Sequence, residues 1–188
     1  MMFALSERAQ DFITRTQAFI QQEIEPIEKA FWDEVHQLNV DGDWTKWQWP
    51  AQLEQLKTKA KAAGLWNMFL PDTELGAGLS VQEYAHIAEL TGRSLLAPTV
   101  FNCNAPDSGN MEVLWRYGSR EQKQQWLQPL LNGDIRSVFC MTEPAVASSD
   151  ATNMQATAVI DGDEIVLNGR KWWSSGLGDP NAKIIIFM

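Results

Sequence analysis

Residues 139–153 read FCMTEPAVASSDATN, a composition that is typical of neither a hydrophobic core nor an ordinary loop. A short apolar run ends before Thr142, and Pro144 then interrupts the backbone. Small and hydroxyl-bearing residues follow as far as Asp150. Small side chains allow a ligand to approach backbone amides, and hydroxyls both donate and accept hydrogen bonds. These residue types alone predict a binding site for a polar, anionic ligand directly after a strand.

The composition excludes several classes of protein. The chain has 188 residues, 45% of them apolar, and a formal net charge of −9. This apolar content suffices for a folded core, whereas the acidic balance disfavours nucleic-acid binding. No apolar run reaches the length of about 20 residues that spans a bilayer, and the N-terminus shows no targeting signal. Two cysteines do not make a disulfide framework, so we expect a reducing, cytoplasmic location.

The periodicity of the apolar residues changes along the chain. Helical spacings come first, and Pro26 is expected to bend the first helix. The expected helices cover residues 5–38, 51–63, 80–92, 96–104, 110–117 and 119–128. Alternating runs follow, with a hairpin turn at Asp161-Gly162-Asp163. The expected strands cover residues 136–141, 154–160, 164–167, 171–174 and 183–187.

This order of elements predicts an α+β protein in which helices and strands are segregated. We expect an all-α domain over residues 1–132 and an incomplete antiparallel β-barrel or sandwich over residues 133–188. The last strand, IIIF, would offer a hydrophobic edge. We therefore expect that the natural polypeptide continues or that a partner covers this edge.

A second unusual stretch, NGRKWWSSG, covers residues 168–176. On a strand, Trp172 and Trp173 would point to opposite faces, so one ring could pack inward while the other lies beside a ligand. Ser174 and Ser175 add two more hydroxyls. The alternative interpretation is one core tryptophan, one surface tryptophan and a Ser-Gly turn.

Neither stretch contains a recognisable nucleophile or metal site. His36 and His86 lie far from both stretches and in no catalytic pattern, and the Cys and His residues lack zinc-site spacing. Glu143 and Asp150 could form a pair of carboxylates, but acidic residues in loops mostly face water or cap turns.

Together the two stretches resemble the flavin-dependent acyl-CoA dehydrogenases. The matching pattern is an aromatic residue, two further residues, Thr-Glu-Pro, a small-residue loop and Ser-Asp, and then Asn-Gly-x-Lys-x-Trp-Ile-Thr/Ser. GLWNMFLP, EYAHIAELTGRS and YGSREQKQQWLQPLLNGDIRSVFCMTEP extend the resemblance over essentially the whole chain. APDSGNMEVL, ASSDATN and KWWSSG resemble the branch that acts on long-chain and hydroxylated acyl-CoAs. The loop before Asp150 departs from the family's Gly-Ala-Gly-Ser-Asp, because it is one residue longer and lacks glycine.

The resemblance implies FAD as cofactor, an acyl-CoA as substrate and dehydrogenation of that thioester as the reaction. Residues implied to bind FAD are Phe139, Met141 and Thr142 at the ring, Ser148 and Ser149 near the pyrophosphate, and Trp173, Ser174 and Ser175 beside the ring. Ser149 would also touch the substrate, and Ser175 would lie near flavin N5. The family's catalytic carboxylate comes from a C-terminal domain that this chain lacks, so no catalytic residue is assigned and the isolated chain is expected to be inactive. Glu143 is expected to be structural.

The implied partners are an electron-transfer flavoprotein or a similar acceptor, and further copies of the chain in a homo-oligomer. Two alternatives remain open at this point. One is an acyl-CoA oxidase or flavin monooxygenase on the same scaffold. The other is a non-catalytic, truncated paralogue or fragment that acts as a binding or oligomerisation module. A DNA-associated member of the wider family is disfavoured by the acidic balance.

Overall fold

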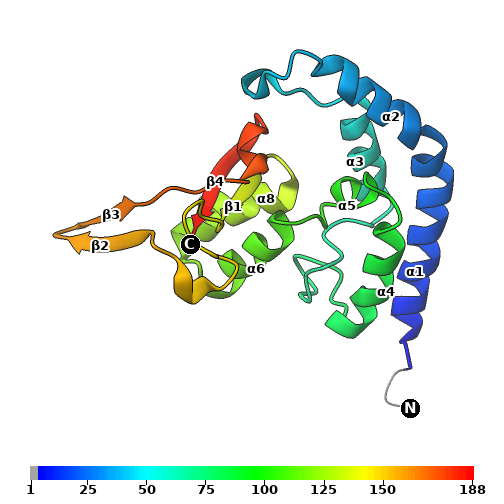
Figure 1. Ribbon diagram of the computed structural model, residues 1–188. Coiled ribbons are helices and arrows are strands. Elements are labelled where there is room, and N and C mark those ends of the chain that lie inside the picture. The colour runs from blue at the N-terminus through cyan, green and yellow to red at the C-terminus, as the bar shows by residue number, and fades with distance from the viewer. Residues whose placement is uncertain (1–3) are drawn as a thin grey trace.

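The computed structural model describes residues 4–188 and consists of a helical part followed by a smaller part with few strands (Figure 1). The α+β class with segregated helices and strands is therefore confirmed, and the described strands close no barrel. None of the helices within residues 4–188 combines the length and the apolar character that a membrane span requires.

The chain begins with one long, bent helical rod. It comprises α1 (Glu7–Phe19), the π-helical turn η1 (Ile20–Ile24) and α2 (Glu25–Leu38). Ser6 caps its start, because the Ser6 hydroxyl accepts a hydrogen bond from the Ala9 amide at 3.1 Å. The π turn ends two residues before Pro26, a residue without an amide hydrogen. The expected bend is thus made by a wider helical turn, and the helix continues through the proline.

Shorter helices pack inside this rod and beyond it. They are α3 (Gln52–Ala62), α4 (Val81–Thr91), α5 (Ala97–Val100), α6 (Asp107–Tyr117), α7 (Arg120–Gln122), the π turn η3 (Lys123–Leu127) and α8 (Gln128–Asn132). The 3₁₀ turn η2 (Trp44–Lys46) lies in the loop before α3. A capping box between Ser80 and Glu83, which are three residues apart, starts α4.

Three helix boundaries differ from the prediction, and the first difference is that α6 begins at Asp107 instead of residue 110. The expected helix over residues 96–104 is reduced to α5, because Asn102 adopts a left-handed φ of 54°. The Asn102 amide is held there by Asn67 Oδ1 at 2.7 Å and the Leu130 carbonyl at 3.0 Å. The last helix extends to Asn132 instead of residue 128, because Pro129, like Pro26, lies two residues after a π turn.

Two hydrophobic cores organise the helices. The first contains Phe31, Met68 and Phe101 and joins the long rod to α3, α4 and α5. The second contains Leu70, Met111 and Leu130, and Ile184 packs against it. The second core therefore joins α6 and α8 to the strand that contains Ile184.

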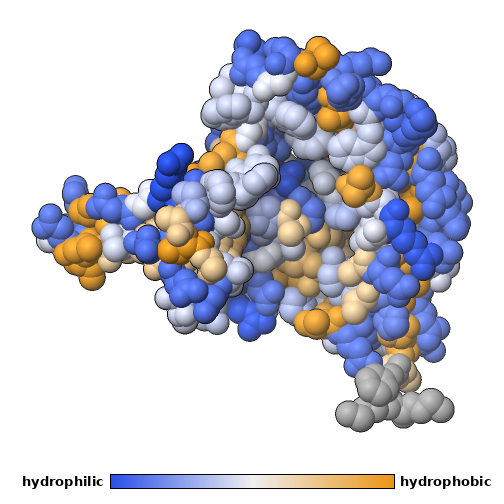
Figure 2. Space-filling view, viewed as in Figure 1, coloured by the Kyte–Doolittle hydropathy of each residue, from blue (hydrophilic) through white to orange (hydrophobic). Residues whose placement is uncertain are grey.

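The strands form two separate pairs. They are β1 (Arg136–Cys140), β2 (Thr157–Asp161), β3 (Glu164–Asn168) and β4 (Ala182–Phe187), with the 3₁₀ turns η4 (Ala151–Asn153) and η5 (Ser175–Gly178) between them. β2 and β3 form the predicted antiparallel hairpin, and Gly162 supplies the positive φ of its turn. The hairpin projects from the rest of the molecule and carries exposed apolar side chains (Figures 1 and 2).

Two features of the strand region were predicted wrongly. β1 and β4 pair in parallel, whereas all strands were expected to be antiparallel. Residues 171–174 form no strand, because their hydrogen bonds run to residues 141–143 and not along a ladder. Trp173 is left-handed, with φ at 57°, which ends any extended run at that residue.

Candidate functional site

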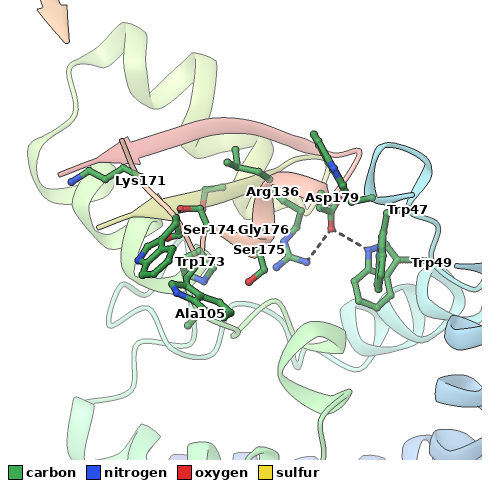
Figure 3. Close-up of a pocket in the computed structure, with 16 residues that line it drawn as sticks. Trp47, Trp49, Ala105, Arg136, Lys171, Trp173, Ser174, Ser175, Gly176 and Asp179 are labelled. Carbon is green, nitrogen blue, oxygen red and sulfur yellow. Dashed lines mark hydrogen bonds and ion pairs between the residues drawn. The ribbon is translucent and has the colours of Figure 1, made fainter. Parts of the chain in front are cut away.

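A cleft of about 1060 Å³ separates the loop before α3 from the segment that follows Lys171 (Figure 3). Tryptophans dominate both walls: Trp44, Trp47 and Trp49 belong to the loop before α3, and Trp172 and Trp173 belong to the segment after Lys171. Lys171 and residues 174–179 continue the second wall, and the lining is completed by Arg136, Ser137, Ala105 and Pro106. Flat apolar rings beside hydroxyls suit a flat heterocycle that has a polar edge.

An ion pair joins the two unusual stretches of sequence. Lys171 Nζ donates to Glu143 Oε1 at 2.8 Å and to the Met141 carbonyl at 3.0 Å. The Glu143 carboxylate also accepts the amides of Gln155 at 2.7 Å and Ala156 at 2.9 Å. Both charged side chains are buried, with 5% of Lys171 and 4% of Glu143 exposed. Glu143 is thus a structural anchor, as expected, and its oxygens are occupied.

The charge of Glu143 makes the stability of this region depend on pH. The hydrogen bond from the Lys171 ammonium, followed by that from the Gln155 amide, lowers the pKa of Glu143 from 4.5 to about 2. A folded-state pKa below the unfolded value stabilises the fold above that unfolded value, and the stabilisation is lost as the pH falls. We expect the free energy of unfolding to decline between pH 4.5 and about 2. Urea titrations across this range would measure a steeper decline for the wild type than for Glu143→Gln, and equal slopes would contradict the prediction.

The loop after Glu143 folds around its own side chains. Ser148 is buried, and its hydroxyl accepts a hydrogen bond from the Glu143 amide at 2.7 Å. Asp150 accepts from the Thr152 amide at 3.0 Å and caps the turn η4. Ser149 is exposed at this corner. Glu143 and Asp150 therefore have separate partners and make no carboxylate pair.

Trp173 combines an unfavourable backbone with an exposed ring. Its φ of 57° lies in a region that aromatic residues rarely occupy, and 80% of the residue is exposed. The ring contacts Trp172 edge to face, with centroids 5.7 Å apart. The Trp172 and Trp173 rings thus contact each other and do not point to opposite faces of a strand. Backbone strain without burial indicates a side chain placed for a ligand, because core packing does not compensate the strain.

A buried polar cluster supports the floor of the cleft. Asp107 of α6 is 1% exposed and pairs with Arg136 of β1 through the Arg136 Nε. Asp107 Oδ1 also accepts the Ser137 amide at 2.7 Å and the Ser137 hydroxyl at 2.5 Å. Asn110 donates to the same hydroxyl at 2.9 Å. The sequence reasoning missed this cluster, whose members lie far apart in the chain and match no motif.

Family models cover nearly the whole chain in two matches. Residues 6–134 match the model for the acyl-CoA dehydrogenase N-terminal domain, and residues 138–188 match the model for its middle domain. The chain belongs to the acyl-CoA dehydrogenase family. The predicted resemblance is confirmed.

Individual acyl-CoA dehydrogenases agree with this family membership. Acyl-CoA dehydrogenase family member 11 of Rattus norvegicus is 52% identical over 187 residues, covering 100% of this chain and 23% of the relative. A solved structure of a candidate acyl-CoA dehydrogenase from Mycobacterium abscessus is 62% identical, with a TM-score of 0.91 over 98% of this chain and 46% of that one. Glutaryl-CoA dehydrogenase from Mycobacterium smegmatis, solved in complex with FADH2, is 26% identical, with a TM-score of 0.60 over 90% of this chain and 39% of that one. The chain thus spans about a quarter of the curated relative and less than half of each solved chain.

The residues that the acyl-CoA dehydrogenase resemblance implies fall into two groups in the structure. Trp173, Ser174 and Ser175 line the cleft. The other five lie outside its lining: Phe139, Met141, Thr142, Ser148 and Ser149. The Thr142 carbonyl nevertheless accepts the Trp172 amide at 3.0 Å, which ties the first stretch to the wall of the cleft.

The structure adds cleft residues that no motif indicated. Trp44, Trp47 and Trp49 line it from the helical side. The one available signal was their spacing, since three tryptophans within a short loop are unusual for surface residues. Residues 4–188 contain no cluster of His, Cys, Asp or Glu suited to a metal ion.

Proposed function

We propose that this chain forms part of the flavin site of an FAD-dependent acyl-CoA dehydrogenase. The observation that carries the proposal is the cleft wall of Trp173, Ser174 and Ser175, anchored through Lys171 to the Thr-Glu-Pro stretch. An exposed indole beside two hydroxyls offers stacking for a flat ring and hydrogen bonds for its polar edge. The residues present therefore fit a flavin.

Each side chain has a distinct part in this proposal. The Trp173 ring would lie against the flavin, and the Ser175 hydroxyl would hydrogen-bond its polar edge. The Glu143–Lys171 pair would hold the segment that carries both residues, and the tryptophans of the opposite wall would exclude water. Bound FAD supplies the acceptor for a hydride. Glu143 takes no part in proton abstraction, because its oxygens are occupied by Lys171 and two backbone amides.

Titration of the purified chain with FAD, followed by flavin fluorescence, tests the proposal. We expect saturable binding that Ser175→Ala weakens about fivefold, through the loss of one hydrogen bond. Thr58→Ala is the control, because its exposed hydroxyl bonds only the Glu54 carbonyl within α3. Absence of saturable binding by the folded wild-type chain would refute the proposal.

Trp173→Gly separates a ligand-binding role from a structural one. Glycine tolerates the φ of 57°. We therefore expect the free energy of unfolding of the unliganded variant to equal that of the wild type or to exceed it by up to about 1 kcal/mol. FAD affinity should fall about tenfold with the lost stacking surface. Thermal unfolding and FAD titration measure the two effects. A clear loss of stability with unchanged affinity would identify Trp173 as structural.

The finer assignments are proposals that extend from the family resemblance. We propose a long-chain or hydroxylated acyl-CoA as substrate, an electron-transfer flavoprotein or a similar acceptor, a homo-oligomer and a cytoplasmic location. Cys103 and Cys140 are free thiols, which suits a reducing compartment.

A second candidate function is a binding or oligomerisation module. It is favoured by the hairpin of β2 and β3, where Ile160 is 79% and Ile165 66% exposed. Association that depends on concentration, in a chain that binds no FAD, would favour this module over the flavoprotein.

A further inference from the structure

One contact joins the two walls of the cleft across 130 positions of sequence. The Trp49 indole N–H donates a hydrogen bond to Asp179 Oδ2 at 3.1 Å (Figure 3). Trp49 belongs to the loop before α3, whereas Asp179 directly follows η5. The same two turns also touch through Trp44, because a Cβ on Gly178 would lie 3.7 Å from the Trp44 carbonyl oxygen.

Asp179 organises the segment on its own side of the cleft. Its Oδ1 accepts the Asn181 amide at 2.8 Å, and its backbone amide donates to the Gly176 carbonyl at 3.1 Å. Arg136 Nη1 lies 3.8 Å from Oδ2, the atom that Trp49 also contacts. Asp179 therefore connects η5 with the start of β4, and a shift of its carboxylate would move both.

The Trp49 ring is fixed by its aromatic neighbours. It stacks on Phe31, with centroids 6.5 Å apart, and contacts Trp32 at 6.3 Å and Trp47 at 5.8 Å edge to face. Phe31 is fully buried in the first core. A ring enclosed on several sides cannot turn its N–H away without disturbing that core. Packing within the helical part of the protein thus fixes the direction of the Trp49 N–H toward Asp179.

We propose that Trp49 is a positioning residue that holds Asp179 and thereby fixes the segment carrying Ser174 and Ser175. The inference rests on the proposed flavin function for its consequence, since those hydroxyls would contact the cofactor. Trp49 itself makes its contact with protein, and it acts on the cofactor only through Asp179. A site on two separate parts of the chain needs such a link, because small displacements of contacting groups weaken binding strongly.

Trp49→Phe tests the inference, with Trp32→Phe as its matched control. Phenylalanine keeps an aromatic ring but is smaller than indole, so both variants lose side-chain volume, and only Trp49→Phe also removes a hydrogen-bonded N–H. The Trp32 N–H is buried in the same aromatic cluster and has no hydrogen-bond partner within residues 4–188. We expect hydrogen exchange of the amides in residues 175–182 to rise about fivefold in Trp49→Phe, with exchange elsewhere unchanged. FAD should bind less tightly with a shifted absorption band, and Trp32→Phe should match the wild type in every measurement.

The two readouts separate the possible failures. Unchanged exchange at residues 175–182 in Trp49→Phe would overturn the inference, as would an increase spread evenly over the whole chain. Faster exchange confined to this segment would support it even if the wild-type chain bound no FAD. That combination would refute the flavin function and leave the link between the walls intact.

Discussion

Lys171→Met is expected to lower the free energy of unfolding by about 3 kcal/mol, because it leaves a buried carboxylate without its cation. The Lys171 ammonium is 5% exposed, bonds Glu143 and the Met141 carbonyl, and lies 5.0 Å from the centre of the Phe187 ring. Methionine retains most of the apolar stem but none of these polar contacts. Urea denaturation followed by tryptophan fluorescence would measure the loss, which should appear first in the strand region.

Lys183→Met provides the control in the same region. Lys183 is exposed on β4, and its ammonium bonds only the Pro180 carbonyl at 3.0 Å. Its replacement should change the stability by less than about 0.5 kcal/mol. Addition of Glu143→Gln to Lys171→Met should restore part of the loss, since the unpaired charge disappears. A Lys171→Met protein within about 1 kcal/mol of the wild type would show that the pair contributes little.

Asp107→Ala is expected to cost a similar amount, about 3 kcal/mol, at the contact between α6 and β1. The substitution removes the acceptor of the Ser137 amide and hydroxyl and the partner of the Arg136 guanidinium. Arg136 and Ser137 both line the cleft, so its floor should also lose its shape. Urea denaturation would measure the loss of stability. FAD titration would measure the loss of affinity that follows from a distorted floor of the cleft.

The geometry predicts how conservative variants of Asp107 differ. Asp107→Asn keeps one oxygen for Ser137 but removes the charge that pairs with Arg136. Its free energy of unfolding should therefore lie between those of the wild type and Asp107→Ala. Asp33→Ala is the surface control, because Asp33 pairs with Lys29 one helical turn away in full solvent and should contribute less than about 0.5 kcal/mol. Equal losses for the asparagine and alanine variants of Asp107 would show that the ion pair, and not the Ser137 bonds, carries the effect.

Local signals in the sequence predicted most of the elements correctly. The capping box of Ser80 and Glu83, the cap at Ser6 and the turn at Gly162 each act within a few residues, so their effects can be derived without the fold. The errors arose where distant residues decide the backbone. Helix formation stops before Asn102 because its side chain is held by Asn67 and Leu130, and no local pattern encodes those partners.

The candidate site shows the same division. Trp173, Ser174 and Ser175 lie in one continuous motif, and all three line one wall of the cleft. The strand expected there does not form, because the left-handed φ of 57° at Trp173 ends the extended run after a single backbone bond from the Trp172 amide to the Thr142 carbonyl. The opposite wall and the floor depend on contacts such as Trp49 with Asp179, which join distant parts of the chain.

The sequence by itself determined the class of fold and the family, because periodicity, caps and motifs are read within short stretches of chain. Tertiary structure alone decided the parallel pairing of β1 with β4, the left-handed backbone of Trp173 and the closing of the cleft by the tryptophans before α3. These features depend on contacts between residues far apart in sequence, such as Lys171 with Glu143 and Trp49 with Asp179. The desolvation that makes such pairs strong arises only when the whole chain has packed.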